Sequence, residues 1–454
     1  MKSLHSADVV ICGAGIAGVS AAYHLAVRHG VKNLVLVDER SPLTLTSDKG
    51  TEAYRNWWPG PDDAMVRFMN RSIDLLEELT EQTAFNLNRR GYVFVTSSPE
   101  RFQEMKKNAV EISSLGAGEL RFHPGSSAYT PSPAEEYRNL PTGADIIEDR
   151  ELIQRHFPFL GDDVVGLVHA RRCGWLDAKR LGTWLLQEAQ AAGVRIVQDC
   201  VERVPVQNNR VETIHLASGA DLNAGAFVIA AGPYVERVGA MLGVEIPVFN
   251  ELHAKISFSD SKRIIPRDVP MMILNDPAVL PWGEVERKKF AADNNARRLL
   301  EQFPGGVHVR TRGGIESDEI LLIWTYDMSP QEPIWPPAFD TYYAEILIRG
   351  LSRMIPQFSV YFGQGSKAFV DGGYYCKTRE NRPLIGPLPV RGAFVIGALS
   401  GFGIMASQAA ADLLSAHVTG SDLPEYAPAF SFDRYENAAY STLLHILDSS
   451  SGQL

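Results

Sequence analysis

A glycine-rich run near the N-terminus constrains the fold more than any other feature of the sequence. The run Gly13-Ala14-Gly15-Ile16-Ala17-Gly18 follows a segment of strand character, Ala7–Cys12, and precedes an alanine-rich segment that predicts a helix to about His29. In such a turn the first glycine permits the tight bend, the second lets the backbone approach a pyrophosphate, and the third lets helix and strand pack closely. The helix N-terminus then faces the negative charge. The run therefore predicts a Rossmann-like parallel sheet that binds a dinucleotide.

The next strand adds a carboxylate to this prediction. Residues 33–38 read as a second buried strand, and Glu39 stands at its end, 21 residues after Gly18. A carboxylate at this position accepts hydrogen bonds from ribose hydroxyls and repels a 2′-phosphate. A flavoprotein reductase that also binds NAD(P)H usually carries a second glycine fingerprint, and the sequence has only this one. The pattern therefore favours FAD over NAD.

Length and charge limit the remaining possibilities. The 454 residues are several times the ~100–150 of a common single domain, so we expect two domains. The formal charge of −10, from 54 acidic and 44 basic residues, argues against a nucleic-acid partner. The apolar stretch 9–27 is long enough to resemble a membrane span, but its glycine spacing assigns it to the dinucleotide site. We therefore predict no membrane span.

The cysteines indicate neither a disulfide framework nor a metal centre. Cys12, Cys173, Cys200 and Cys376 are scattered without the spacing of metal ligands, so no metal site is predicted. The polar N-terminus, residues 1–7, lacks the apolar core of a secretory signal. Together these features predict a cytoplasmic protein, and they leave its oligomeric state open.

Four further segments resemble one enzyme family in both content and order. They are Gly174-Trp175-Leu176-Asp177, the strand and turn 226–233, the segment 378–386, and the strand and turn 394–403. The chain resembles, over nearly its whole length, the D-amino-acid oxidase, glycine oxidase and sarcosine oxidase family of FAD-dependent oxidoreductases. The resemblance implies an α/β fold with α+β character. A Rossmann-like FAD-binding domain of the glutathione-reductase type would be interleaved with an antiparallel-sheet substrate domain.

The resemblance also assigns the cofactor residues. Glu39 would hold the adenosine ribose, the backbone near Val201 would meet the adenine, and Ala231 with Gly232 would pass near the nucleotide. A helix N-terminus at 400–403 would lie under the flavin, where backbone amides and the positive end of the dipole stabilise the anionic reduced ring. The full predicted cofactor set is Gly13, Gly15, Ile16, Ala17, Gly18, Asp38, Glu39, Arg40, Thr46, Ser47, Val201, Ala231, Gly232, Gly397, Ser400, Gly401, Phe402, Gly403 and Ile404.

The cofactor segments are separated along the chain, which predicts an interrupted domain. Alternating apolar patterns at 91–95, 253–258, 307–310 and 320–324 predict strands of a second sheet that roofs the flavin. The expected boundaries are an FAD-binding domain from 1–88, 150–245 and 368–428, a substrate domain from 89–149 and 246–367, and a C-terminal tail at 429–454.

Candidate substrate-binding residues come from one loop and from the roof strands. The segment Gly50-Thr51-Glu52-Ala53-Tyr54-Arg55 resembles a family loop whose arginine binds the substrate carboxylate, and an arginine fork suits that group. The alternative for Arg55 is a surface residue packed beside Trp57 and Trp58.

The roof strands offer two further pairs. His253 and Lys255 share one strand face, as do His308 and Arg310, so either pair can face the flavin or form a solvated stripe. Tyr326 either contacts substrate or fills the core.

Three positions depart from the family pattern. Gly373 stands where sarcosine-oxidase-type enzymes attach flavin through a cysteine, so we predict non-covalent FAD. Met405 stands where such enzymes grip the carboxylate with a lysine. The position of their oxygen-activating lysine falls on an apolar residue near Ile323. Because Met405 replaces the carboxylate-binding lysine, an amine without an α-carboxylate stays possible as the substrate. Because the oxygen-activating lysine is replaced as well, the choice between an oxidase and a dehydrogenase stays open.

These features predict an enzyme that oxidises the C–N bond of a small-molecule amine or amino acid. Hydride would pass to flavin N5, the imine would be hydrolysed, and the electrons would go to O₂ or another acceptor. Two alternatives remain. One is oxidation of a hydroxy acid or alcohol on the same cofactor, and the other is a flavin-binding subunit of a larger oxidoreductase complex.

Overall fold

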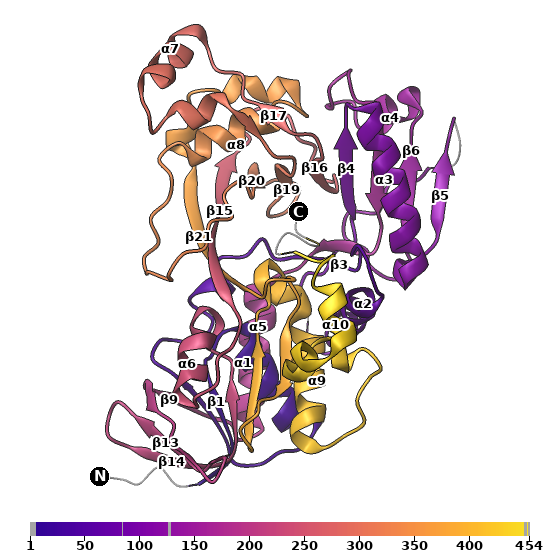
Figure 1. The fold of residues 1–454 in the computed structure, drawn as a ribbon. Helices are drawn as coiled ribbons and strands as arrows, with labels where there is room; N and C mark the ends of the chain where they lie inside the picture. Colours follow the sequence, from indigo (N-terminus) through magenta and orange to yellow (C-terminus); the bar gives the residue numbers. More distant parts are fainter. Residues whose placement is uncertain (1–5, 84, 126–128, 449–451, 453–454) are drawn as a thin grey trace.

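Two large sheets organise the chain, one in each half of the view in Figure 1. The structure, a computed structural model, describes residues 6–83, 85–125, 129–448 and 452. The first sheet has eight strands, ordered β10-β13-β14-β1-β2-β9, with β23 paired to β14 and β22 paired to β23. Its strands are β1 (Ala7–Cys12), β2 (Leu34–Asp38), β9 (Arg195–Gln198), β10 (Val201–Arg203), β13 (Thr213–Leu216), β14 (Asp221–Ile229), β22 (Leu384–Pro387) and β23 (Ala393–Gly397).

The central strands of this sheet are parallel, as the glycine-rich run predicts. β1 lies between β2 and β14 and pairs in parallel with both, while β9 and β23 extend the parallel part on either side. β1 and β2 are apolar almost throughout because both faces of a parallel sheet are covered. The carboxyl ends of β1 and β2 therefore meet at one edge, where ligands of such sheets bind.

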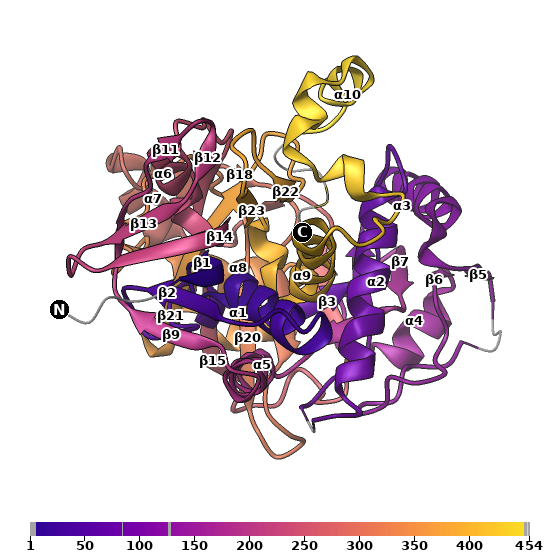
Figure 2. The same ribbon diagram turned by 90° about the horizontal axis from the view of Figure 1, so that it is seen from below.

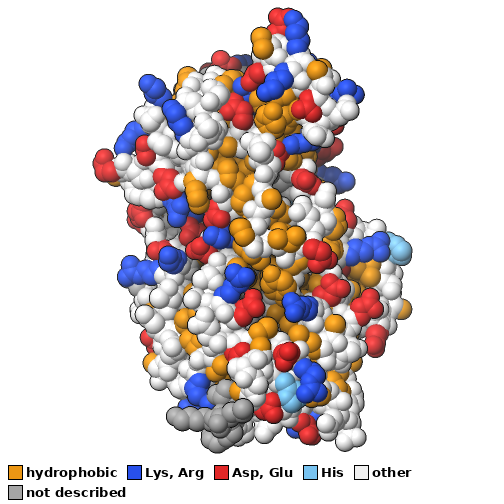
Figure 3. All heavy atoms as spheres, turned by 90° about the vertical axis from the view of Figure 1, so that its left-hand side faces the viewer, with side chains coloured by type: hydrophobic (Ala, Val, Ile, Leu, Met, Phe, Trp, Pro, Cys, Tyr) orange, Lys and Arg blue, Asp and Glu red, His pale blue; other side chains and the backbone are white. Residues whose placement is uncertain are grey.

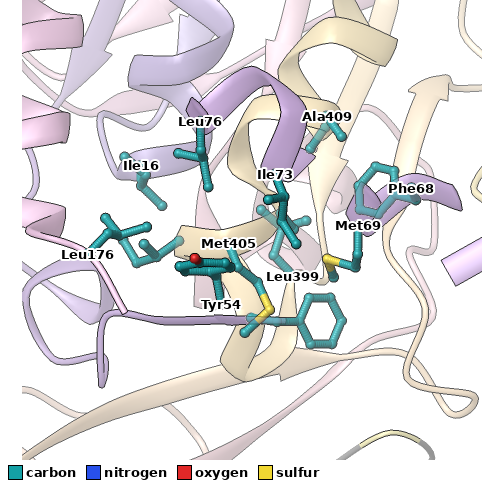
Figure 4. Close-up of a cluster of buried hydrophobic side chains, with 14 of the residues drawn as sticks. Ile16, Tyr54, Phe68, Met69, Ile73, Leu76, Leu176, Leu399, Met405 and Ala409 are labelled. Atoms are coloured by element: carbon teal, nitrogen blue, oxygen red, sulfur yellow. The ribbon is translucent and has the colours of Figure 1, made fainter. Parts of the chain in front are cut away.

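Helices from distant parts of the chain cover this sheet. α1 (Ile16–Tyr23) continues through a π-helical turn to Arg28 and packs against α5 (Ala178–Ala191) and α9 (Gly403–Thr419). α2 (Ala64–Leu79) packs against α9 in turn. Figure 4 shows Met69 and Ile73 of α2 in one apolar cluster with Met405 and Ala409 of α9. The cluster fixes the N-terminal end of α9 against the first sheet.

The second sheet has nine strands, ordered β21-β15-β20-β19-β16-β4-β7-β6-β5. It is antiparallel except at two pairs, β16 with β4 and β5 with β6. All four segments predicted as roof strands contribute to it. Its strands are β4 (Tyr92–Thr96), β5 (Leu120–His123), β6 (Ala144–Ile147), β7 (Gly166–Ala170), β15 (Phe249–Ser259), β16 (Met271–Leu274), β19 (His308–Thr311), β20 (Glu319–Ile323) and β21 (Phe369–Lys377).

The two sheets exchange segments more often than the predicted boundaries suggest. β7 and β21 belong to the second sheet, although the boundaries group both with the FAD-binding segments. β7 pairs with β4, and β21 pairs with β15 over nine residue pairs, so long-range pairing decides where both strands lie. A short ladder of β3 (Ala53–Arg55) with β8 (Cys173–Trp175) stands apart from both sheets.

Shorter elements complete the fold. The remaining α-helices are α3 (Pro99–Ile112), α4 (Arg150–His156), α6 (Val235–Met241), α7 (Glu284–Ala292), α8 (Tyr343–Leu351) and α10 (Ala438–Leu443). The remaining strands form two short antiparallel pairs, β11 (Val206–Gln207) with β12 (Arg210–Val211) and β17 (Ala278–Val279) with β18 (Gln302–Phe303). No helix in the described ranges is both long enough and apolar enough to cross a bilayer. Figure 3 shows apolar side chains along the middle of one face, with charged ones mainly to either side.

The predicted C-terminal tail folds back onto the molecule. Arg434 is buried, and its Nη2 donates to Glu380 Oε1 at 2.6 Å. Tyr435 and Tyr440 donate to the same oxygen at 2.9 Å and 3.0 Å. α10 follows this anchor and lies at the edge of the molecule in Figure 2. Of this tail, residues 449–451 and 453–454 lie outside the described residues, as do residues 1–5 of the N-terminus.

We expect Arg434→Leu to lower the free energy of unfolding by about 3–5 kcal/mol, because it leaves the Glu380 carboxylate buried without its cation. Urea denaturation followed by tryptophan fluorescence measures the change. Lys288→Ala is the control, because Lys288 and its partner Glu284 are both about four-fifths exposed, at 77% and 81%. Equal effects of the two substitutions would contradict the role given to Arg434.

Candidate functional site

A mainly apolar groove opens at the carboxyl ends of β1 and β2, and we call it the dinucleotide cavity. Its volume is about 1390 Å³, including space open to solvent. Most of the predicted cofactor residues line it, namely Gly13, Gly15, Ile16, Ala17, Asp38, Glu39, Thr46, Ser47, Val201, Ala231, Gly232, Gly397, Ser400 and Gly403. Sequence segments that lie hundreds of residues apart therefore meet at one groove.

The three glycines of the run have different reasons to be glycine. A Cβ on Gly13, whose φ is +111°, would collide with the backbone of Ala230, and one on Gly18 would collide with the carbonyl of Gly13. A Cβ on Gly15 would meet only Ser47 Oγ, at 3.2 Å. Gly13 and Gly18 are thus needed for packing within the protein. The structure itself leaves room at Gly15, so the glycine there keeps the loop open to a ligand.

Side chains hold the glycine loop in place. Ser47 Oγ accepts from the Ile16 amide at 2.8 Å, and Asp38 Oδ2 accepts from the Ala14 amide at 2.6 Å. Asp38 Oδ1 accepts from the Arg40 amide at 2.9 Å. The Glu39 side chain is 54% exposed and lies 3.4 Å from Arg40 Nε. Asp38 is therefore turned toward the loop, and Glu39 toward the open side.

Five predicted cofactor residues do not line this cavity. Gly18 lies beneath the glycine loop, Arg40 is exposed, and Ile404 belongs to the apolar core. Gly401 and Phe402 line a neighbouring cavity. The sequence prediction did not include Tyr234 and Arg237, which follow the β14 turn and border the groove.

The turn before α9 is conformationally strained. Ala398 and Ser400 adopt φ values of +52° and +46°, which side chains with a Cβ disfavour. This backbone brings Ser400 and Gly403, at the N-terminal end of α9, to the cavity wall. The amides there place positive potential at the groove.

These residues fit FAD. The open position at Gly15, the N-terminal ends of α1 and α9 and the carboxylates at the end of β2 supply the contacts that a dinucleotide needs. The groove also crosses from the first sheet toward β21, where Tyr374 and Cys376 border it.

A second cavity adjoins the turn before α9, and we call it the inner cavity. Its volume is about 540 Å³, including space open to solvent. It brings together Arg55 and His308, two of the six predicted catalytic residues. Its lining is Thr51, Ala53, Arg55, Tyr92, Met271, His308, Ile323, Thr325, Tyr375, Asn381, Ser400, Gly401, Phe402, Met405 and Gly452.

Arg55 is a buried residue of the inner cavity and not a surface arginine. Only 6% of it is exposed, and its guanidinium lies 4.3 Å from the ring centroid of Trp58. Nη1 donates to the Trp57 carbonyl at 3.2 Å, Nη2 donates to the Gly452 carbonyl, and Nε has no partner among the described residues. Burial lowers the pKa of the guanidinium because the charge is removed from water. An anion beside Arg55 would favour the charged form.

His308 presents a neutral imidazole to the same cavity. Nδ1 lies 2.8 Å from the Gly306 carbonyl, which can only accept, so Nδ1 carries the hydrogen and Nε2 is an acceptor. Burial lowers the pKa of His308 to about 4. The ring therefore stays uncharged beside Arg55 at neutral pH.

The other four predicted catalytic residues lie outside the inner cavity. Arg310 donates to the Thr51 carbonyl and to Glu52 Oε2, so it supports the loop that carries Arg55. Lys255 Nζ donates to the Lys49 carbonyl at 2.6 Å, 3.5 Å from Asp371. His253 lies behind Tyr375, with the two rings stacked at 4.0 Å.

Tyr326 faces a different space. It donates to Asp340 and lines a third cavity, which we call the lateral cavity and which has a volume of about 1120 Å³ including open solvent. His253 and Thr325 also line the lateral cavity.

The predicted site residues omit several polar residues of the inner cavity, among them Tyr92 and Thr325. Tyr92 is fully buried, and its hydroxyl has no partner among the described residues. Burial raises the pKa of that hydroxyl, so Tyr92 is a donor. Thr325 follows β20 and lines the cavity as well. Both occur in ordinary apolar strand patterns, which carry no signal of a site.

Met405, which stands where the family pattern has a lysine, lies in apolar surroundings that suit its side chain. It is 6% exposed and packs in the apolar cluster with Tyr54 and Leu399 (Figure 4). An ammonium group at this place would be surrounded by apolar atoms. Arg55 is therefore the cation on the described lining of the inner cavity.

Comparisons with known proteins agree with this geometry. A family model described as "DAO: FAD dependent oxidoreductase" matches residues 8–417. Over 273 residues the chain is 26% identical to the mitochondrial dimethylglycine dehydrogenase of Homo sapiens, a match that covers 59% of this chain and 28% of that protein. It is 22% identical over 256 residues to the sarcosine oxidase subunit beta of Arthrobacter sp, covering 54% of this chain and 55% of that one. The chain thus spans about half or less of these relatives.

Solved structures are similar over almost the whole chain. The L-proline dehydrogenase from P.horikoshii superposes with a TM-score of 0.72 at 19% identity, covering 95% of this chain and 98% of that one. The glycine oxidase from Geobacillus kaustophilus gives a TM-score of 0.70 at 16% identity, covering 95% and 99%. At these identities the likeness shows the shared fold.

We expect Gly15→Ala to weaken FAD binding at least ~10-fold, a loss of about 1.4 kcal/mol, because the new methyl group occupies the path of the pyrophosphate. Titration of the apoprotein with FAD, followed by flavin fluorescence, measures the affinity. Thermal unfolding of the apoprotein should change little, since only Ser47 Oγ lies near the added atom.

Gly314→Ala is the matched control, because nothing lies within 4 Å of its added Cβ. Unchanged FAD affinity in Gly15→Ala would contradict the assignment of the glycine loop.

Proposed function

The chain belongs to the DAO family of FAD-dependent oxidoreductases, and from this premise we propose that it oxidises the C–N bond of a small amine or amino acid bearing an anionic group. The observation that carries the proposal is Arg55. It is a buried cation whose Nε has no hydrogen-bond partner within the part of the chain that the structure describes. It lies on the wall of a cavity that adjoins the dinucleotide cavity through Ser400. Such a group favours an anionic ligand, because a charged pair out of bulk water is held by strong, directional hydrogen bonds.

The chain's own residues have defined tasks in this proposal. Arg55 binds the anionic group of the substrate, with the Tyr92 hydroxyl as a second donor on the same wall. His308 Nε2 accepts a hydrogen bond and adds no charge. Bound FAD supplies the acceptor for the hydride that leaves the carbon next to nitrogen. Anchoring at Arg55 orients that carbon, which is the main demand of this chemistry on the protein.

The surroundings of Gly373 support non-covalent FAD. A Cβ at this position would lie 3.1 Å from Thr46 Cα and 3.3 Å from Lys49 Cβ, so the side chain of a linking cysteine would be tightly confined there. Cys376 borders the dinucleotide cavity, but burial raises the pKa of its thiol to about 12. A thiol held in the protonated form is a poor nucleophile toward a flavin.

Acid denaturation of the purified protein is therefore expected to release all of the flavin into the supernatant. Absorbance of the supernatant and of the washed pellet measures the partition. Flavin that stays with the pellet, and is lost from it in Cys376→Ser, would overturn the non-covalent assignment.

An anaerobic screen tests the reaction class. We expect at least one of sarcosine, dimethylglycine, glycine, L-proline and iminodiacetate to bleach the visible absorbance of the flavin, with lactate and glycolate as the nitrogen-free comparison. Readmission of air with peroxide detection then separates O₂ from another acceptor. Bleaching by the hydroxy acids alone would replace the proposal with alcohol oxidation, and no bleaching by any amine would refute it.

Substitution of Arg55 tests the anchor. We expect Arg55→Met to raise KM for a carboxylate-bearing substrate by about 10–100-fold, the value of one or two hydrogen bonds to a charged group. Inhibition by simple carboxylates should weaken in parallel. The control is Arg312→Lys, because Arg312 is 47% exposed at the surface. An unchanged KM would show that the anionic group binds elsewhere.

The state of the cysteines bears on the cellular setting of the protein. All four cysteines are free, three of them buried, which is in keeping with the reducing, cytoplasmic setting that we propose.

The Arthrobacter relative is named as a subunit, so a role within a larger complex is the second candidate. A flavin that stays oxidised with every substrate until a copurifying partner is added would favour it.

A further inference from the structure

A line of three polar side chains leads from the interior of the second sheet to the inner cavity. Glu251 and His253 lie on β15, and Thr325 follows β20 by two residues. His253 Nε2 is 2.9 Å from Glu251 Oε2, and His253 Nδ1 is 3.3 Å from Thr325 Oγ1. Glu251 is 1% exposed and His253 is 6% exposed. Only Thr325 of the three reaches the wall of the inner cavity.

The register of the sheet explains this alignment. β15 and β20 are antiparallel, and Lys255 lies opposite Ile323. Extending the register by two residues places His253 opposite Thr325, with both side chains on the face that carries Ile323. Ile323 also lines the inner cavity, whose wall includes the turn before α9, so this face of the sheet faces that turn.

The hydrogens along the line have one consistent arrangement. An ionised carboxylate only accepts, so His253 Nε2 carries the hydrogen that bonds to Glu251. His253 Nδ1 is then an acceptor, and the Thr325 hydroxyl donates to it. The Thr325 oxygen keeps its lone pairs for a ligand. Lys377 Nζ donates to the same Glu251 oxygen at 3.0 Å, which supports the carboxylate form.

We propose that Glu251, His253 and Thr325 form a relay that takes the proton from the nitrogen of a bound ammonium substrate. The inference rests on the proposed function, because C–N oxidation needs a neutral amine whose lone pair assists hydride departure. Thr325 is the catalytic residue that touches the substrate. His253 and Glu251 are positioning residues that act through it, in the same order of contacts as a serine-hydrolase triad.

The step conserves atoms and charge. The N–H bond of the ammonium breaks, and its proton bonds to Thr325 Oγ1 while the hydroxyl proton passes to His253 Nδ1. No electron is transferred. The products are a neutral amine and a His253 imidazolium that Glu251 stabilises. His253 also borders the lateral cavity, which is open to solvent, and the proton leaves His253 on that side afterward.

The surroundings keep His253 neutral before the step. Burial lowers the pKa of His253, an effect that the adjacent Glu251 opposes. Nδ1 is therefore unprotonated at neutral pH, and its lone pair accepts the hydrogen bond from Thr325. The charged and titratable groups around the ring are Glu251 and Lys255 on β15, Lys377 and Tyr375 on β21, and Asp327 after β20.

The pH dependence of flavin reduction separates this relay from a purely structural network. The measurement is anaerobic stopped-flow reduction by the most active amine of the screen. We expect Thr325→Val, which is isosteric and lacks the hydroxyl, to slow reduction about 100-fold at neutral pH. The loss should shrink to about 3-fold near pH ~11.5, where an alkylamine with a pKa of about 10.4 is largely neutral in solution.

Thr325→Ser keeps the hydroxyl and is expected to recover most of the rate at neutral pH. A loss in Thr325→Val that is equal at every pH, or absent at neutral pH, would overturn the relay. Because the wild-type enzyme still bleaches in either case, that outcome is distinct from failure of the proposed function.

A second measurement needs no substrate. In the FAD-bound protein labelled with ¹⁵N-histidine, the His253 signals, assigned by their absence in His253→Asn, should show hydrogen on Nε2 and none on Nδ1. Thr325→Val should shift the Nδ1 signal toward that of a free imidazole nitrogen, and Thr325→Ser should not. Hydrogen on Nδ1 in the wild type would refute the direction of the relay.

Discussion

The rest of the structure depends on the close contact between the glycine loop and the end of β14. Gly13 donates its amide to the Val37 carbonyl at 2.8 Å, and the Ala230 amide donates to the Cys12 carbonyl at 2.8 Å. These bonds bring the ends of β1, β2 and β14 together with no space for a side chain at Gly13. Because the loop is fixed there, α1 begins at the cavity wall and the groove opens beside it. A tight turn within the protein and an open approach for the ligand are thus set by neighbouring residues of one short run.

The inner cavity is assembled differently, from the contact between the two sheets. Arg55 comes from the small β3 ladder, His308 from β19, and Tyr375 from β21, while Phe402 comes from the turn before α9. Arg310 ties β19 to the loop before β3 through Glu52, so a residue that supports the cavity also joins the second sheet to the β3 ladder. The composition of this cavity therefore depends on how these separate elements pack together as much as on any single side chain.

Charge is distributed unevenly between surface and interior. The chain carries a net charge of −10, yet its buried residues include cations at Arg55 in β3, Arg310 in β19 and Lys377 in β21. Arg310 and Lys377 are paired with Glu52 and Glu251, because an unpaired buried charge is costly. Among the residues placed by the structure, Arg55 donates to carbonyl oxygens and lies over the ring of Trp58. The imbalance at Arg55 is the physical reason to expect an anionic ligand there.

The sequence by itself determined the dinucleotide site, because its elements are local. Strand, turn and helix are contiguous from Ala7 to Tyr23, and the reasons for Gly13 and Gly15 can be read from their spacing. The sequence also identified Arg55 and placed His253 beside Lys255 on one strand face. Only the tertiary structure decided that His308 joins Arg55, that Arg310 is a support, and that Tyr92 and Thr325 face the same space. Period-2 alternation tells which residues share a face, but the register between β15 and β20 and the docking of two sheets decide what that face meets. Those are long-range pairings, and no local pattern encodes them.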